Sequence, residues 1–143
     1  NMSFIQVGDF IGTALKRGKR NKIKNAIIVG MMGKLSKMAD GRMMTHAAGS
    51  KVNMEMLATF AKDLGATSAV VEEIQEAATA RRVLEICEEQ GIKGITDIIC
   101  EKVVKVCSEH SENKLNINTY LVGFSGNLLG RFEQNETIYR GTL

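Results

Sequence analysis

Apolar positions along the chain follow two periods. Short apolar runs at 4–7, 25–29 and 117–122 predict strands, and the segment 128–132 predicts an antiparallel edge strand after a Gly-Asn turn. Between these runs the apolar residues recur at helical spacing. The expected helices cover 10–17, where Asp9 is a capping residue, then 33–38, 51–64, 68–77, a helix from Thr79 to Gly91, and one that begins at Thr96-Asp97.

The order of these elements predicts the fold class. A helix between the first two strands makes a βαβ unit, so we expect a parallel pair with a right-handed crossover. The continuous apolar run 25–29 is typical of a strand that helices bury on both faces. We therefore expect an α/β fold with a small, mainly parallel sheet of three to four strands flanked by helices. This would be a three-layer, Rossmann-like half of a doubly wound domain, with residues 1–143 forming a single α/β domain.

The stretch 27–46 contains the most distinctive candidate site. A β-branched strand ends at Gly30, and Gly33-Lys34 begins a helix-compatible segment that ends at Asp40-Gly41. Such a turn directs backbone N–H groups and the positive end of a helix dipole toward an anion. Gly8-Asp9 ends the preceding strand, so both turns are expected at one edge of the sheet. The spacing of Gly30 and Gly33 matches neither the dinucleotide fingerprint nor the P-loop, and a tight turn without a ligand explains it equally well.

Several side chains near this turn have two interpretations. His46, after Thr45, is either a hydrogen-bonded structural residue or a ligand contact. Glu55 is either a partner of a helix dipole or an inward-pointing ligand to a sugar or amine. Seven of the eight methionines lie between residues 31 and 56, where they either fill an irregular core or line a pocket for a large apolar ligand.

Composition narrows the possible functions. A net charge of +3, with five Phe and two Tyr that do not interleave with basic residues, argues against nucleic acid. The basic segment 16–24 is either a solvated helix end or a patch that attracts a polyanion. Cys87, Cys100 and Cys107 follow no metal-ligand spacing and are expected to be buried, reduced thiols, so no metal site is predicted. No apolar run approaches the ~20 residues that span a bilayer and no signal peptide is visible, which predicts a cytoplasmic protein without a membrane partner.

Four segments resemble the C-terminal half of the CbiD family, the cobalt-precorrin-5B C(1)-methyltransferases of anaerobic cobalamin biosynthesis. They are Gly8-Asp9-Phe10-Ile11-Gly12, the stretch from Gly30 to Gly41, Thr45-His46, and Met54-Glu55-Met56-Leu57. The likeness extends over about 7–66, and the segment 123–130 is similar to the family's closing strand and turn. The chain departs from the family at Met31, where histidine is usual, and at Lys51 and Asn53, where aspartate and arginine are usual.

The resemblance implies transfer of a methyl group from S-adenosylmethionine to C1 of a cobalt-bound tetrapyrrole, with cobalt entering only as part of the substrate. A basic edge of Lys34, Lys37 and Arg42 would suit the carboxylates of that acceptor. It also implies a longer enzyme whose N-terminal domain is absent here, and a possible homo-oligomer. No general acid, base or nucleophile is required, so the catalytic residues are unknown. The residues implied to bind donor or acceptor are Gly8, Asp9, Gly12, Gly30, Met31, Gly33, Lys34, Lys37, Gly41, Thr45, His46 and Glu55.

Two other functions are compatible with the residues. The chain could be a noncatalytic α/β module that binds an anionic nucleotide or acts as an interaction domain. A weaker alternative is a nucleic-acid-binding domain that uses the basic segment 16–24.

Overall fold

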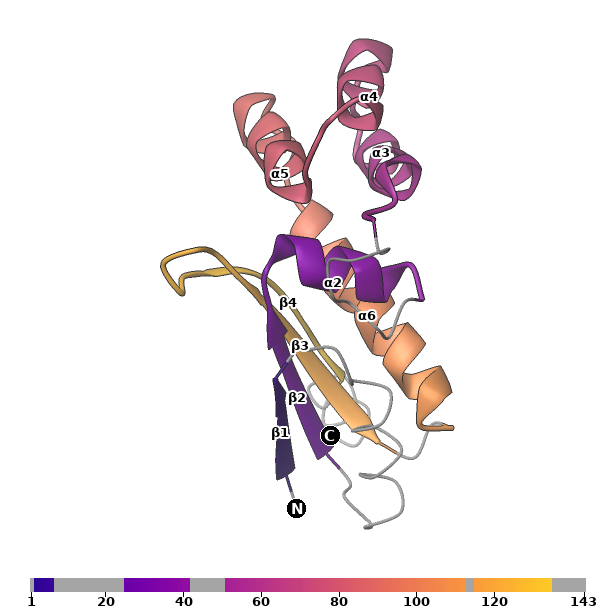
Figure 1. Ribbon diagram of the computed structural model, residues 1–143, viewed down its shortest axis with the longest axis vertical. Coiled ribbons are helices and arrows are strands. Elements are labelled where there is room, and N and C mark those ends of the chain that lie inside the picture. The colour runs from indigo at the N-terminus through magenta and orange to yellow at the C-terminus, as the bar shows by residue number, and fades with distance from the viewer. Residues whose placement is uncertain (1, 7–24, 42–50, 113–114, 135–143) are drawn as a thin grey trace, which may run out of the picture.

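The computed structural model describes residues 2–6, 25–41, 51–112 and 115–134, and for residues 2–6 only the backbone is described. Four strands form one sheet in the order β1-β2-β3-β4 (Figure 1). The strands are β1 (Met2–Gln6), β2 (Asn25–Gly30), β3 (Asn116–Val122) and β4 (Leu128–Glu133). β1, β2 and β3 are parallel, and β4 returns antiparallel to β3. The α/β class, the parallel first pair and the antiparallel edge strand are therefore confirmed.

The helices occupy two places relative to this sheet. α2 (Met32–Ala39) and α6 (Ile95–His110) lie together on one face, and α6 packs on β3 and β4 (Figure 1). α3 (Met54–Asp63), α4 (Ser68–Gln75) and α5 (Ala80–Glu89) stand beyond the carboxyl ends of β2 and β3. Among the described helices none covers the second face of the sheet. The three-layer, Rossmann-like arrangement therefore stays a prediction, and the helix expected at 10–17 lies outside the described residues.

Burial within β2 alternates along the strand. Ala26 and Ile28 are buried, whereas Ile27 and Val29 are only partly buried. The described helices bury one face of this strand, so the expectation that helices bury both faces stays a prediction. An unbroken apolar run does not distinguish full burial from a strand with one buried and one half-buried face, because β-branched residues suit both environments.

The start of α6 differs from the expectation. Thr96 and Asp97 do not cap this helix; its N-cap residue is Gly94, with φ of 104°. Instead, Thr96 Oγ1 donates to the carbonyl oxygen of Leu129 (2.7 Å), and Asp97 Oδ1 accepts from the backbone N–H of Arg131 (2.8 Å). The two side chains connect α6 to the edge strand β4, because unpaired backbone groups of that strand lie within their reach.

Side chains cap the starts of α3, α4 and α5 in the ordinary way, whereas Met31 at the start of α2 makes no such hydrogen bond. Asn53 Oδ1 accepts from the N–H of Met56 (3.1 Å), so α3 begins at Met54 rather than at residue 51. Thr79 Oγ1 accepts from the N–H of Arg82 (3.1 Å), which confirms the predicted cap of α5. These side chains satisfy N–H groups that have no partner within the helix.

The three cysteines are buried free thiols, as predicted. Cys100 and Cys107 lie on the inner side of α6 within the main core, which also contains Ile28, Leu35 and Leu121. Burial raises the pKa of both thiols from 9.0 to about 12, because the interior disfavours the thiolate.

This burial predicts a specific loss of stability at alkaline pH. Between pH 9 and about pH 12 the unfolded chain releases these thiol protons while the folded chain retains them, so the free energy of unfolding should fall as the pH rises. Urea unfolding at several pH values across this range measures the slope of the free energy of unfolding against pH. The double variant Cys100→Ala/Cys107→Ala should show a shallower fall than the parent protein. An identical slope in both proteins would contradict the prediction.

Candidate functional site

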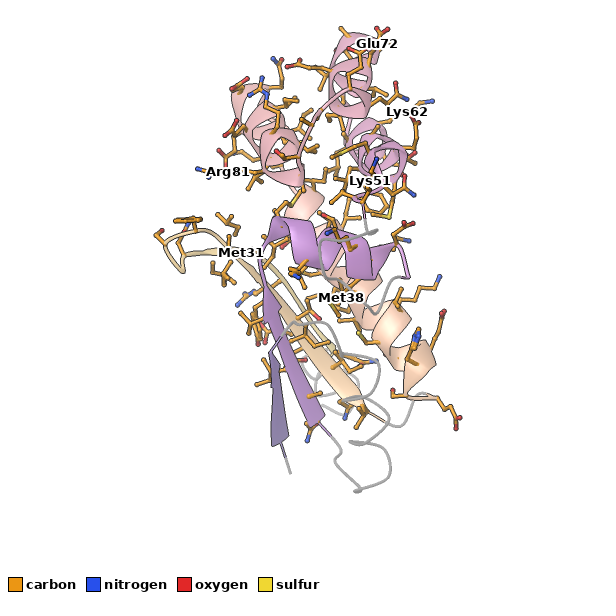
Figure 2. All side chains as sticks on the ribbon, in the orientation of Figure 1. Met31, Met38, Lys51, Lys62, Glu72 and Arg81 are labelled. Atoms are coloured by element: carbon orange, nitrogen blue, oxygen red, sulfur yellow. The ribbon has the colours of Figure 1, made fainter. Side chains whose placement is uncertain are left out.

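A pocket of about 1040 Å³ lies beyond the carboxyl ends of β2 and β3. Its walls come from the start of α2, the segment before α3, the start of α5 and the hairpin that joins β3 to β4. Figure 2 shows Met31 at the end of β2, with Lys51 and Arg81 on the helical side of the same region. Open α/β sheets bind their ligands at this edge.

The lining of the pocket is mostly apolar. Met31 immediately precedes α2, Met54 is the first residue of α3, Leu84 lies in α5, and Leu129 lies in β4. Met54, Leu84 and Leu129 are half-buried, and Met31 is 44% exposed. Such a surface can contact the hydrophobic body of a ligand and exclude water from it.

Charged side chains also line the pocket. Lys37, Lys51 and Arg81 supply positive charge, and Glu85 and Glu88 supply negative charge. The Arg81 guanidinium lies 5.7 Å from the centre of the Phe124 ring, and its Nε is 4.0 Å from Glu85 Oε2. This ion pair is long and solvent-exposed, so it contributes little to stability. Arg81 can therefore turn toward a ligand carboxylate at small cost.

A tight turn holds Phe124 at the tip of the β3–β4 hairpin. The N–H of Gly126 donates to the carbonyl oxygen of Gly123 (2.9 Å), and the N–H of Gly123 donates to the carbonyl oxygen of Asn127 (2.7 Å). Gly126 has φ of 84°, which favours glycine at this position. The turn leaves the Phe124 side chain 84% exposed beside the pocket.

The structure brings part of the expected glycine edge to this pocket. Met31, Gly33 and Lys37 line it, and Gly30 ends β2 immediately before it. Lys34 is half-buried on α2 and Gly41 follows the other end of that helix, and neither lines the pocket. The remaining residues of the expected edge lie outside the described residues: Gly8, Asp9, Gly12, Arg42, Thr45 and His46.

Glu55 is not part of the pocket. It is exposed in the first turn of α3, and its Oε2 accepts from Gln75 Nε2 of α4 (3.1 Å). The inward-pointing orientation considered for this carboxylate is therefore wrong. Its place near the helix N-terminus agrees with the alternative, interaction with the helix dipole.

Sequence reasoning missed the wall made by α5 and the hairpin. The candidate residues proposed from the sequence end at Glu55, yet Arg81 and Leu84 of α5 line the pocket, as does Phe124. The available signal was a phenylalanine inside a Gly-Phe-Ser-Gly turn, where a large apolar side chain has no core to enter.

Two departures from the family pattern, Met31 and Lys51, also line the pocket. The third, Asn53, caps α3 and donates to Asp40 Oδ1 (3.0 Å).

Two further searches cover the described residues alone. They contain no group of three or more His, Cys, Asp or Glu side chains that could hold a metal ion. No helix among them is long and apolar enough to cross a membrane.

An open α/β sheet with a mostly apolar pocket beyond its parallel strands is the arrangement in which many α/β domains bind their ligands. The chain belongs to the CbiD family: the family model described as "CbiD, C-terminal domain" matches residues 44–133. This confirms the resemblance to the C-terminal part of that family.

Three relatives illustrate the match, and each is named cobalt-precorrin-5B C(1)-methyltransferase. The Leptospira interrogans protein is 54% identical over 132 residues, which cover 92% of this chain and 36% of the relative. The Thermus thermophilus protein is 47% identical over 92 residues, which cover 64% of this chain and 25% of the relative. The Geobacillus kaustophilus protein is 36% identical over 144 residues, which cover 98% of this chain and 39% of the relative. The matched part of the chain thus spans between 25% and 39% of the length of these relatives, and no solved structure matches it significantly.

Proposed function

We propose that the chain is the C-terminal domain of an enzyme that transfers a methyl group from S-adenosylmethionine to C1 of cobalt-precorrin-5B, in anaerobic cobalamin biosynthesis. The printed names of the relatives support the reaction. The pocket at the carboxyl edge of the sheet carries the proposal for this chain, because it combines an apolar lining with cationic side chains. Cobalt enters only as part of the tetrapyrrole substrate.

The chemistry asks for alignment rather than for an acid or a base. S-adenosylmethionine supplies an electrophilic methyl group, and the protein has to orient donor and acceptor and exclude water. In this proposal Met31 and Leu84 exclude water from the ligand, while Lys37 and Arg81 hold ligand carboxylates. Backbone N–H groups at the start of α2, where Gly33 lines the pocket, favour a negatively charged group at the same edge.

The proposal also covers the chain's surroundings. A further N-terminal domain completes the active site, residues 1–143 act as one Rossmann-like domain, and the enzyme is a homo-oligomer. We place it in the cytoplasm, because the three cysteines are unpaired thiols, as is usual in a reducing compartment.

The Gly33→Leu variant of the full-length enzyme tests the proposal. A Cβ built on Gly33 meets nothing within 4 Å, so the added side chain starts in open space at the pocket. Leucine also suits the interior of α2 better than glycine. We expect transfer of an isotope-labelled methyl group from S-adenosylmethionine to cobalt-precorrin-5B to fall by at least about tenfold, since blocked contacts worth 1.4 kcal/mol suffice for that loss.

Ala69→Leu is the matched control. Ala69 is the second residue of α4, as Gly33 is of α2, and it is exposed and does not line the pocket. This variant should retain full methyl transfer. If the unmodified enzyme transfers no label at all, the proposed reaction is wrong and the noncatalytic binding module becomes the better description. If Gly33→Leu retains full transfer, the pocket has no part in the reaction.

A further inference from the structure

Three large hydrophobic side chains are exposed among the described residues: Met31 (44% exposed), Phe124 (84%) and Leu128 (53%). Met31 and Phe124 line the pocket, whereas Leu128 does not. Exposed apolar side chains are ordinary when scattered, but a group at the edge of a pocket marks a contact surface. The ligand should therefore present a broad apolar face at the mouth.

Phe124 is arranged to meet such a face with its ring. The turn from Gly123 to Gly126 fixes the backbone on both sides of it, and Arg81 lies 5.7 Å from the centre of the ring. A cation at this distance favours one ring orientation, by about 0.5–1 kcal/mol at exposed sites. An oriented aromatic plane at a pocket mouth suits stacking on a flat ligand.

The charges and the size of the pocket point to the same kind of ligand. Among the described lining residues, three cations (Lys37, Lys51 and Arg81) face two carboxylates, so these side chains favour an anion over a cation. The cavity of about 1040 Å³ lies at the upper end of the roughly 300–1,000 Å³ of ordinary small-molecule pockets. S-adenosylmethionine is compact, and its sulfonium gives it net positive charge at neutral pH. A tetrapyrrole is broad and flat, with an apolar ring and several carboxylates at its edge.

We propose that this pocket holds the tetrapyrrole rather than the methyl donor, with Phe124 stacked on the face of the macrocycle and Arg81 paired with a ring carboxylate. The assignment rests on the proposed function and adds the ligand of this pocket and two residues that select it. Phe124 recognises the flat ring of the ligand, and Arg81 recognises its negative charge. The donor then lies elsewhere in the complete enzyme.

Equilibrium binding to the full-length protein tests this assignment. The probes are cobyrinic acid, a cobalt corrin with free carboxylates, and cobinamide, which has the same ring with amides in place of all of them. We expect cobyrinic acid to bind more tightly than cobinamide. Arg81→Ala should weaken the binding of cobyrinic acid by about tenfold, in line with the loss of a hydrogen bond between charged groups. The same variant should leave the binding of cobinamide unchanged. Phe124→Leu should weaken the binding of both corrins. Phe124→Tyr should bind both as the unmodified protein does, because tyrosine keeps the aromatic plane.

Arg82→Ala is the matched control for Arg81→Ala. Arg82 is the next residue of α5, but it pairs with Glu73, Glu85 and Glu89 and does not line the pocket. It should leave corrin binding unchanged. S-adenosylhomocysteine, titrated into the same variants, should bind as it does to the unmodified protein.

Two results would overturn the assignment. If Arg81→Ala and Phe124→Leu weaken S-adenosylhomocysteine and not cobyrinic acid, the pocket belongs to the donor, and the proposed methyl transfer still stands. If no variant changes the binding of either ligand, the pocket takes neither. Failure of the proposed function has a separate signature, in which corrin binding behaves as expected but no methyl group is transferred.

Discussion

Gly130→Ala should lower the free energy of unfolding by about 3 kcal/mol, at the upper end of the usual cost of overpacking. A Cβ on Gly130 would lie 2.6 Å from Cβ and Oγ1 of Thr96 and 2.8 Å from the Thr96 carbonyl carbon. The last contact is with the backbone of α6, so no change of side-chain rotamer relieves it. β4 must then move away from α6 and weaken the bonds that Thr96 and Asp97 make to it.

Gly33→Ala is the matched control for this substitution. The same methyl group at Gly33 meets nothing within 4 Å, and the residue lies within α2. Alanine is the better helix former by about 0.5–1 kcal/mol, so this variant should be slightly more stable than the parent. Urea unfolding of both variants gives the comparison. A Gly130→Ala protein as stable as the parent would show that α6 and β4 do not pack this closely.

Thr119→Val and Thr96→Val should change stability in opposite directions. Thr119 is fully buried in β3, and its hydroxyl has no hydrogen-bond partner among the described residues. Valine has the same shape without the buried hydroxyl, so we expect a gain of about 1 kcal/mol. Thr96 is also buried, but its hydroxyl donates to the Leu129 carbonyl at 2.7 Å. Loss of that bond leaves a partly buried acceptor unsatisfied and should cost about 2 kcal/mol.

Thermal or urea unfolding of the two valine variants separates them by the sign of the change. The pair forms its own control, because both substitutions replace the same hydroxyl by the same methyl group in a buried site. Destabilisation by Thr119→Val equal to that of Thr96→Val would mean that the Thr119 hydroxyl has a partner in solution.

Much of the fold followed from local pattern. The strand at 25–29, the cap at Thr79 and the antiparallel return after Asn127 all depend on short-range chemistry, and the structure has each of them. The errors concern tertiary contacts. Thr96 and Asp97 look like capping residues, but a strand more than thirty positions later takes their hydrogen bonds. The burial of β2 likewise depends on where the helices pack, which the apolar run itself does not encode.

The candidate site was predictable on one side only. The strand-to-helix turn at Gly30–Gly33 stands out in the sequence, because it follows an apolar strand at the sheet edge where α/β folds bind ligands. Arg81 is unremarkable in its own helix, and only the packing of α5 above the sheet edge brings it beside Phe124. The contacts between such distant positions depend on the topology, so no spacing rule could have revealed this wall.

The hairpin at the pocket has a consequence for synthesis and turnover. One wall begins at Met31 and the opposite wall extends to Leu129, so the pocket is complete only after nearly a hundred intervening residues have left the ribosome and β4 has paired with β3. A ligand that bridges both walls binds the paired form alone and stabilises it by mass action. Cells rich in the ligand would therefore contain protein whose edge strand exchanges its amide hydrogens more slowly and is cut less readily by proteases.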